Sequence, residues 1–155
     1  MTDRELMRRA IELSEESIGK GGGPFGAVVA RNGEIIAEAS NSVTMDCDPT
    51  AHAEVKAIRI AAGKLATYDL SGCVIYASCE PCPMCLGAIY WAHIDKIFYA
   101  NNRINAAMIG FDDADIYEEM SLAPADRRLP SEILMPNEGK RAFDMWMRKS
   151  DKVEY

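Results

Sequence analysis

Two short motifs hold residue types that bind metals and move protons. His52 and Glu54 are two positions apart, and Cys82 and Cys85 are three positions apart. The surrounding pattern places each motif in the first turn of a helix, where the helix dipole lowers the pKa of a thiol and favours the thiolate. Cysteines three apart lie on one helical face and can bind one ion together. The motifs therefore predict a metal centre shared by two helices.

This set of ligands favours zinc. Two thiolates and one imidazole suit Zn²⁺, and three protein ligands leave the fourth tetrahedral position for a water molecule, whose pKa zinc lowers to about 7. Glu54 is displaced around the helix from His52, so its carboxylate can take a proton from that water and pass it to a substrate. We predict one Zn²⁺ per chain, bound by His52, Cys82 and Cys85, with Glu54 as a catalytic residue.

The same cysteines allow two other kinds of site. If Cys79 were a fourth ligand beside His52, Cys82 and Cys85, the zinc site would be closed and structural, with no place for water. Cys82 and Cys85 by themselves also fit a redox pair. A structural site would leave Glu54 without a role, so we prefer the catalytic interpretation.

Length and composition limit the fold and the partners. A chain of 155 residues is long enough for one ordinary domain, so we expect residues 1–155 to form a single domain. Hydrophobic residues make up 48% and charged residues 26%, which excludes a disordered or collagen-like chain. The net charge of -7 disfavours a nucleic acid or an anionic membrane as partner.

The location of the protein is suggested by what the sequence lacks. No apolar run approaches the roughly 18 to 20 residues that cross a bilayer. The N-terminal run MTDRELMRRAIELSEES has acidic residues where a signal peptide is apolar. Three of the five cysteines lie within seven residues, which favours metal binding or catalysis over disulfides. We therefore expect a cytoplasmic protein.

Hydrophobic periodicity predicts a mixed sheet layered with helices. Asn32-Gly33 between two apolar runs is a strong hairpin signal, because both turn residues tolerate positive φ. Asp48 is a suitable N-cap and Pro49 a suitable first residue for the helix that ends at Gly63. The other expected elements are a helix over 6–18, hairpin strands over 27–31 and 34–40, a strand over 72–78, a helix from Pro81 to about Trp91, a strand over 96–100, a short strand over 131–135 and a helix over 137–149.

Four runs of sequence resemble a known family: GGPFGAVV (22–29), DPTAHAEVKAIR (48–59), SCEPCPMCLGAIYWA (78–92) and GFDD (110–113). They are similar to the cytidine-deaminase-like superfamily, whose signature is H-x-E followed by P-C-x-x-C, and within it to the small bacterial guanine deaminases. The resemblance implies an α/β fold of three layers, a mixed five-stranded sheet flanked by helices. It also implies a zinc-dependent aminohydrolase that converts guanine to xanthine and ammonia.

The resemblance extends to residues of the substrate pocket. Asn41 matches an asparagine that hydrogen-bonds the purine, although a polar residue at a strand end also satisfies local backbone. Phe25 and Trp91 match apolar or aromatic positions near the base, and core packing is the alternative for both. The backbone of Ala53 would face the pocket.

A second proton donor is implied by the GFDD run. Asp113 matches an acid that assists protonation of the leaving amine, with Asp112 as the fallback and a solvated acidic loop as the alternative. In the enzymes that the chain resembles, the C-terminal segment, here 131–155, crosses to the partner of a homodimer. Its tail, here ending in Tyr155, helps close the partner's site. The alternative is a helix packed on its own chain.

Other functions remain possible on the sequence alone. The same chemistry could act on cytosine, guanosine, another nucleoside or a triazine. Adenosine in tRNA is disfavoured by the net charge of -7. A non-catalytic interaction protein stabilised by zinc is a third possibility, and Glu54 argues against it. We expect a small purine base as substrate, without nucleic-acid or membrane partners.

Overall fold

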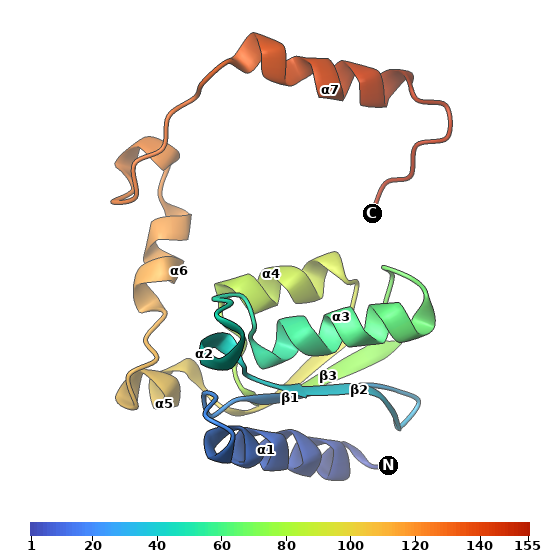
Figure 1. Cartoon of the computed structure of the whole chain (residues 1–155), viewed down its shortest axis with the longest axis vertical. Helices are drawn as coiled ribbons and strands as arrows, with labels where there is room; N and C mark the ends of the chain where they lie inside the picture. Colours follow the sequence, from blue (N-terminus) through green and yellow to red (C-terminus); the bar gives the residue numbers. More distant parts are fainter. The chain divides into compact units, whose positions relative to one another are not determined.

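The computed structural model describes all residues, 1–155. It divides the chain into two compact units, Met1–Asp113 and Ala114–Tyr155 (Figure 1). The first unit contains the sheet and all the buried residues, and the second contains none. The candidate site therefore has to be sought first in residues 1–113.

A four-stranded mixed sheet forms the middle of the first unit. The order is β2-β1-β3-β4, with β1 antiparallel to β2 and β3, and β3 parallel to β4. The strands are β1 (Gly26–Arg31), β2 (Glu34–Ser40), β3 (Cys73–Cys79) and β4 (Lys96–Asn101). The predicted mixed sheet is confirmed, and so is the hairpin, whose turn residues Asn32 and Gly33 have φ of 52° and 77°.

The predicted fifth strand is wrong in this structure. Residues 131–135 form no strand and are all exposed. The segment is flanked by Pro130 and Pro136, and proline lacks the N–H that a ladder needs. A short apolar run by itself forms no strand, because the backbone must also find a neighbouring strand with which to pair.

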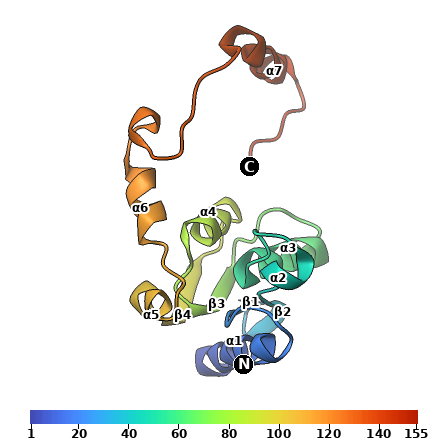
Figure 2. The ribbon, with the colours of Figure 1, turned by 60° about the vertical axis from the view of Figure 1, so that its left-hand side comes forward.

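Helices cover both faces of the sheet, giving three layers (Figures 1 and 2). Helix α1 (Asp3–Gly19) lies on one face, and α3 (Ala53–Leu65) and α4 (Pro83–Trp91) lie on the other. Alternating residues of β1 supply both cores: Val28 packs in the cluster with α1, and Val29 packs in the cluster with α3 and α4. The nearly continuous apolar run of β3 is explained by this double burial.

Helix α3 begins later than the sequence predicts. It starts at Ala53 with His52 as its N-cap, and Pro49 lies outside it. Asp48 does not cap the helix: its Oδ1 accepts from the N–H and the hydroxyl of Thr50, at 2.8 and 2.7 Å. Asp side chains bond in this way to backbone two residues on, which stabilises a turn instead of a helix start.

Helix α4 also begins later than predicted, at Pro83 instead of Pro81. A residue before proline is pushed out of the α region by its clash with the proline ring. Cys82, directly before Pro83, is accordingly extended, with φ of -66° and ψ of 170°, and is the N-cap. Both delayed starts put a predicted metal ligand at a helix boundary.

The weakly patterned region 101–130 contains short helices that the sequence analysis left unassigned. These are α5 (Arg103–Met108), α6 (Ala114–Ser121) and a 3₁₀ turn (Pro124–Asp126). Another short helix, α2 (Val43–Asp46), lies between β2 and α3, and the predicted closing helix is present as α7 (Pro136–Arg148). No helix of the chain is both long enough and apolar enough to cross a membrane.

Candidate metal centre and active site

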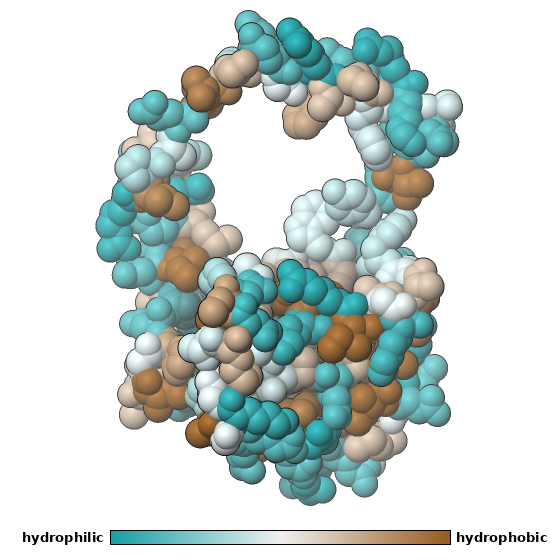
Figure 3. All heavy atoms as spheres, in the orientation of Figure 1, coloured by the Kyte–Doolittle hydropathy of each residue, from teal (hydrophilic) through white to brown (hydrophobic).

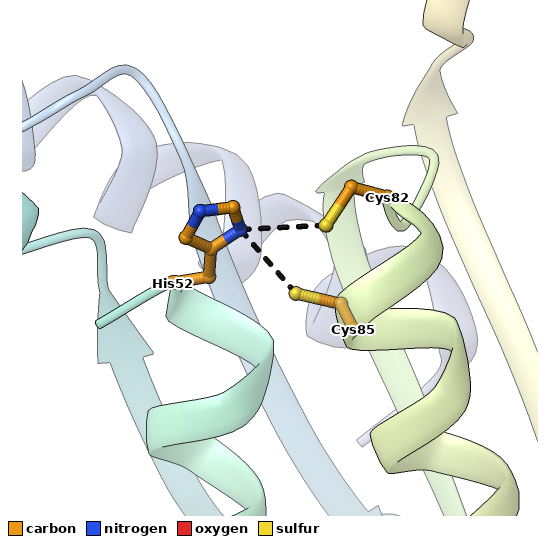
Figure 4. Close-up of side chains that lie close together, drawn as sticks. All are labelled: His52, Cys82 and Cys85. Carbon is orange, nitrogen blue, oxygen red and sulfur yellow. Dashed lines mark hydrogen bonds between the residues drawn. The ribbon is translucent and has the colours of Figure 1, made fainter. Parts of the chain in front are cut away.

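The predicted metal ligands meet where α3 and α4 begin. His52 is the N-cap of α3, Cys82 is the N-cap of α4, and Cys85 lies in the first turn of α4. Figure 4 shows the imidazole of His52 and the two thiols pointing toward one another. Their ligand atoms all lie within 4.8 Å of one another. The two sequence motifs therefore form one cluster of three side chains.

The spacing of this cluster fits tetrahedral zinc. His52 Nδ1 lies 3.5 Å from Cys82 Sγ and 3.5 Å from Cys85 Sγ. Zn–S bonds of about 2.3 Å and Zn–N bonds of about 2.0–2.1 Å at tetrahedral angles separate N from S by about 3.6 Å. The imidazole thus already lies at the distance from each thiol that one shared ion requires.

The electrostatics of the three groups also suit a cation. Hydrogen bonds with Cys85 and with His52 lower the pKa of the Cys82 thiol to about 4. The hydrogen bond with Cys82, together with burial, raises the pKa of the Cys85 thiol. The hydrogen bond with Cys82 also raises the pKa of His52. One thiolate thus hinders formation of the second, and a divalent cation between them would stabilise both.

Glu54 lies beside this cluster. It is buried in the first turn of α3, and its carboxylate interacts with the Cys85 thiol. Burial raises the pKa of the Glu54 carboxyl. A carboxyl group that can hold a proton next to a metal-bound water is suited to general acid and base catalysis.

Cys79 is not part of the metal cluster. Its Sγ donates to the carbonyl oxygen of Asn102 at 3.8 Å, and burial raises the pKa of its thiol to about 11. The group of side chains whose ligand atoms lie close enough to share one ion consists of His52, Cys82 and Cys85 and does not include Cys79. The geometry thus gives no support to the closed four-ligand site.

Asn41 follows β2 directly and is buried. Its side-chain Oδ1 accepts from the N–H groups of Gly23 and Val43, at 3.3 and 3.2 Å. Part of its function is therefore to satisfy local backbone, as the alternative interpretation expected. The Nδ2 group makes no hydrogen bond within the chain and is available to a ligand.

An aromatic pair connects two of the resembling runs. The rings of Phe25 and Phe111 meet edge to face with centroids 4.9 Å apart, and Phe25 also packs against the core cluster of α3 and α4. Phe111 belongs to the GFDD run but was not predicted as a site residue, because edge-to-face packing leaves no periodic signal. Ala53, at the start of α3, is fully buried.

The two candidate second acids differ in burial. Asp113 is half-buried, whereas Asp112 is exposed. Partial burial raises the pKa of the Asp113 carboxyl, and the negative charge of Cys82 raises it further. A raised pKa keeps the carboxyl protonated to higher pH, as a proton donor requires. Burial and charge therefore favour Asp113 over Asp112 for this role.

Comparison with known proteins agrees with this arrangement. Residues 1–101 match the family model described as the cytidine and deoxycytidylate deaminase zinc-binding region. The chain belongs to this deaminase family. As a member, the deaminase uses one Zn²⁺ per chain, and His52, Cys82 and Cys85 are the group that could hold it.

Two kinds of relative differ in how much of the deaminase they match. A guanine deaminase from Bacillus subtilis is 47% identical over 156 residues, covering 100% of both chains. A crystal structure of guanine deaminase from the same species superposes with a TM-score of 0.96, covering 100% of this chain and 99% of that one. A tRNA-specific adenosine deaminase from Aquifex aeolicus is 40% identical over 95 residues, 61% of this chain and 63% of its own.

Two predicted pocket residues of the deaminase are exposed. Trp91 is the last residue of α4, 65% exposed, and nine residues of helical rise place it about 13 Å along the axis from Cys82. Tyr155 is exposed at the end of the second unit. Binding of substrate by either residue stays a prediction.

Proposed function

We propose that this deaminase hydrolyses guanine to xanthine and ammonia. The observation that carries the chemistry is the cluster of His52, Cys82 and Cys85 with the protonatable carboxyl of Glu54 against it. Guanine as the substrate is supported by a similarity to a guanine deaminase that extends over the whole chain, whereas similarity to the tRNA-specific enzyme covers 61% of it.

The reaction replaces the exocyclic amine at C2 of the purine by an oxygen from water. Zinc, when bound, supplies Lewis acidity and lowers the pKa of a water molecule. Glu54 accepts a proton from that water and passes it to a ring nitrogen. The water oxygen forms its bond to C2, and Asp113 donates a proton to the departing amine, so that the C2–N bond breaks and neutral ammonia leaves. The proton that remains on the C2 oxygen returns to Asp113, which leaves the carbonyl group of xanthine.

The base is held by groups on the other elements. Asn41 donates through Nδ2 to an acceptor of the purine, and Phe25, fixed by Phe111, lies beside Asn41 with an aromatic ring for contact with the base. The backbone at Ala53 begins α3, where N–H groups lack partners within the helix and can bind substrate. Trp91 and Tyr155 stay predicted contacts of the base, Tyr155 from the tail of the chain.

The assay is ammonia release from guanine, cytosine, adenine and guanosine by the zinc-loaded protein. Guanine should react fastest, because a site built to hydrogen-bond one base edge rejects analogues that leave its polar groups unpaired. Faster ammonia release from cytosine or guanosine would show that this compound, and not guanine, is the preferred substrate. No release from any of them, with zinc bound, would support a non-catalytic interaction protein.

A homodimer is the second part of the proposal. Large hydrophobic side chains are exposed in the second unit, among them Phe143, Trp146 and Met147 of α7. Figure 3 shows hydrophobic residues, in brown, at the surface of the molecule. Apolar surface of this kind marks an interaction site. We infer that residues 131–155 pack on the partner in a swapped homodimer, with Tyr155 closing the partner's site. A location in the cytoplasm stays a prediction from the sequence.

The swap can be tested by complementation. A chain lacking residues 151–155 should fold and bind zinc but turn over guanine slowly, because the tail excludes water from the site. Mixed with a Glu54→Gln chain, it should regain activity, since one site of the mixed dimer then combines an intact Glu54 with an intact tail. A monomer in light scattering, or no recovery after verified exchange of subunits, would exclude the swap.

A further inference from the structure

The side-chain amide of Asn41 is held in a single orientation. The amide contacts two backbone N–H groups, those of Gly23 and Val43, and both are hydrogen-bond donors. The atom that they contact must therefore be the oxygen, since an amide nitrogen cannot accept. The backbone N–H of Asn41 donates to the carbonyl oxygen of Phe25 at 3.0 Å. Nδ2 with its two hydrogens is the group of Asn41 that remains for a ligand.

Ser17 completes the immobilisation of Asn41 from the opposite layer. Its hydroxyl donates to the backbone carbonyl of Asn41 at 3.0 Å. Ser17 is fully buried on the face of α1 whose other buried members are Leu6, Ala10 and Leu13. A hydroxyl among apolar side chains is unfavourable unless it is hydrogen-bonded. Its partner is a residue 24 positions away that belongs to the candidate site.

Ser17 and Asn41 are packed so closely around Gly22 that no side chain fits there. A Cβ added at Gly22 would come within 2.3 Å of the Asn41 carbonyl oxygen and 2.5 Å of Ser17 Oγ. Gly22 also donates its N–H to the carbonyl oxygen of Ser17 at 2.9 Å. The end of α1, the glycine turn and Asn41 therefore form one tightly packed group.

We propose that Ser17 is a positioning residue for substrate recognition. Its hydroxyl fixes the backbone of Asn41, so that Nδ2 meets the ligand as a donor in one place. The site then selects a base with an acceptor there, a ring nitrogen or a carbonyl oxygen, and disfavours one with an amine. The identity of the substrate in this inference comes from the proposed function. The contacts between Ser17 and Asn41 do not depend on it.

The first test compares Ser17→Ala with Ser14→Ala in the zinc-loaded full-length protein. Ser14 is on the same helix, and its hydroxyl donates only to Ile11 within α1, at 2.6 Å. Ser17→Ala should raise KM for guanine about tenfold, the size of one ordinary hydrogen bond, with kcat changed less than about twofold. Ser14→Ala should leave KM and kcat unchanged. An unchanged KM in folded Ser17→Ala would overturn the proposal.

A double-mutant cycle separates positioning from a general structural role. Asn41→Ala removes the side-chain amide and keeps the backbone carbonyl that Ser17 contacts. If Ser17 acts through that amide, Ser17→Ala should have little further effect on KM in the Asn41→Ala background. An equal effect in both backgrounds would show that Ser17 only stabilises the fold, and would refute positioning.

A third measurement needs no substrate. The NMR signals of the Asn41 side-chain NH₂ are identified by their loss in Asn41→Ala. Their order parameter should fall in Ser17→Ala, because the group becomes more mobile, and should stay unchanged in Ser14→Ala. A rigid amide in folded Ser17→Ala would contradict the proposal even if guanine were not the substrate. If Ser17→Ala does not fold, Ser17→Cys, with nearly the same volume and a weaker donor, replaces it in all three tests.

Discussion

Asn41→Asp tests directly which group of Asn41 the substrate uses. The substitution keeps the shape of the side chain and keeps an oxygen at Oδ1, so the bonds from Gly23 and Val43 at 3.3 and 3.2 Å can persist. What changes is Nδ2, which becomes a carboxylate oxygen. A donor that faces an acceptor of the base is thereby converted into a second acceptor.

The size of the effect follows from this exchange. One hydrogen bond to substrate is lost, worth about 0.5–1.5 kcal/mol, and the base acceptor is left unpaired against an oxygen, which costs about 1–3 kcal/mol more. We therefore expect a loss of about 2–4 kcal/mol in transition-state binding. At about 1.36 kcal/mol per factor of ten, kcat/KM for guanine should fall about 30- to 900-fold.

The assay is steady-state ammonia release with zinc content and folding measured on the same samples. Asn105→Asp is the matched control, because Asn105 is exposed and its Oδ1 likewise accepts a backbone N–H, from Asn102 at 3.0 Å. The control should stay within twofold of the parent protein. If Asn41→Asp also stays within twofold while retaining zinc, the Nδ2 group does not bind the substrate and the reasoning is refuted.

Three further predictions concern catalysis, metal and packing. Glu54→Gln should bind zinc and fold but lose about 10²- to 10⁴-fold in kcat, because Gln cannot transfer a proton; near-normal turnover would exclude this role. Cys82→Ser should lose zinc by metal analysis and Cys79→Ser should retain it. Loss of zinc from Cys79→Ser as well would favour the closed four-ligand site. Gly26→Ala should lower Tm by about 2–12 °C from overpacking of about 1–3 kcal/mol, because its Cβ would lie 2.3 Å from the carbonyl oxygen of Ala10. A Cβ at Gly63 would meet no atom within 4 Å, so Gly63→Ala should raise Tm by about 1–4 °C. A lower Tm for Gly63→Ala together with an unchanged Tm for Gly26→Ala would contradict the packing described for the two glycines.

The metal cluster could be predicted from the sequence because its signal is local. Cys82 and Cys85 are three positions apart, and the tie to His52 needs only that two helix N-termini meet above one sheet. The exact helix starts could not be predicted with the same certainty. Asp48 suited a helix cap and also a turn, and only the bonds it makes to Thr50 distinguish the two.

Contacts between distant segments were beyond the sequence. Ser17 is one of the buried residues of α1, and the sequence of that helix does not indicate its hydrogen bond to Asn41, which depends on how the end of α1 meets the end of β2. The role of Phe111 could not be predicted for the same reason, because Phe111 and its partner Phe25 are far apart in the sequence. The strand expected over 131–135 failed because periodicity describes a segment and not the neighbour that it needs.

Metal binding and base recognition depend on different parts of the fold. The zinc ligands lie at the starts of α3 and α4, where the N-terminal helix dipoles favour thiolate. Asn41 is held where α1, the glycine turn at residues 21–23 and β2 meet. Its hydrogen bonds there involve none of the zinc ligands. Substitutions at this junction can therefore change which base is accepted while metal and proton transfer are preserved, and substitutions at the helix starts should abolish turnover of every base alike.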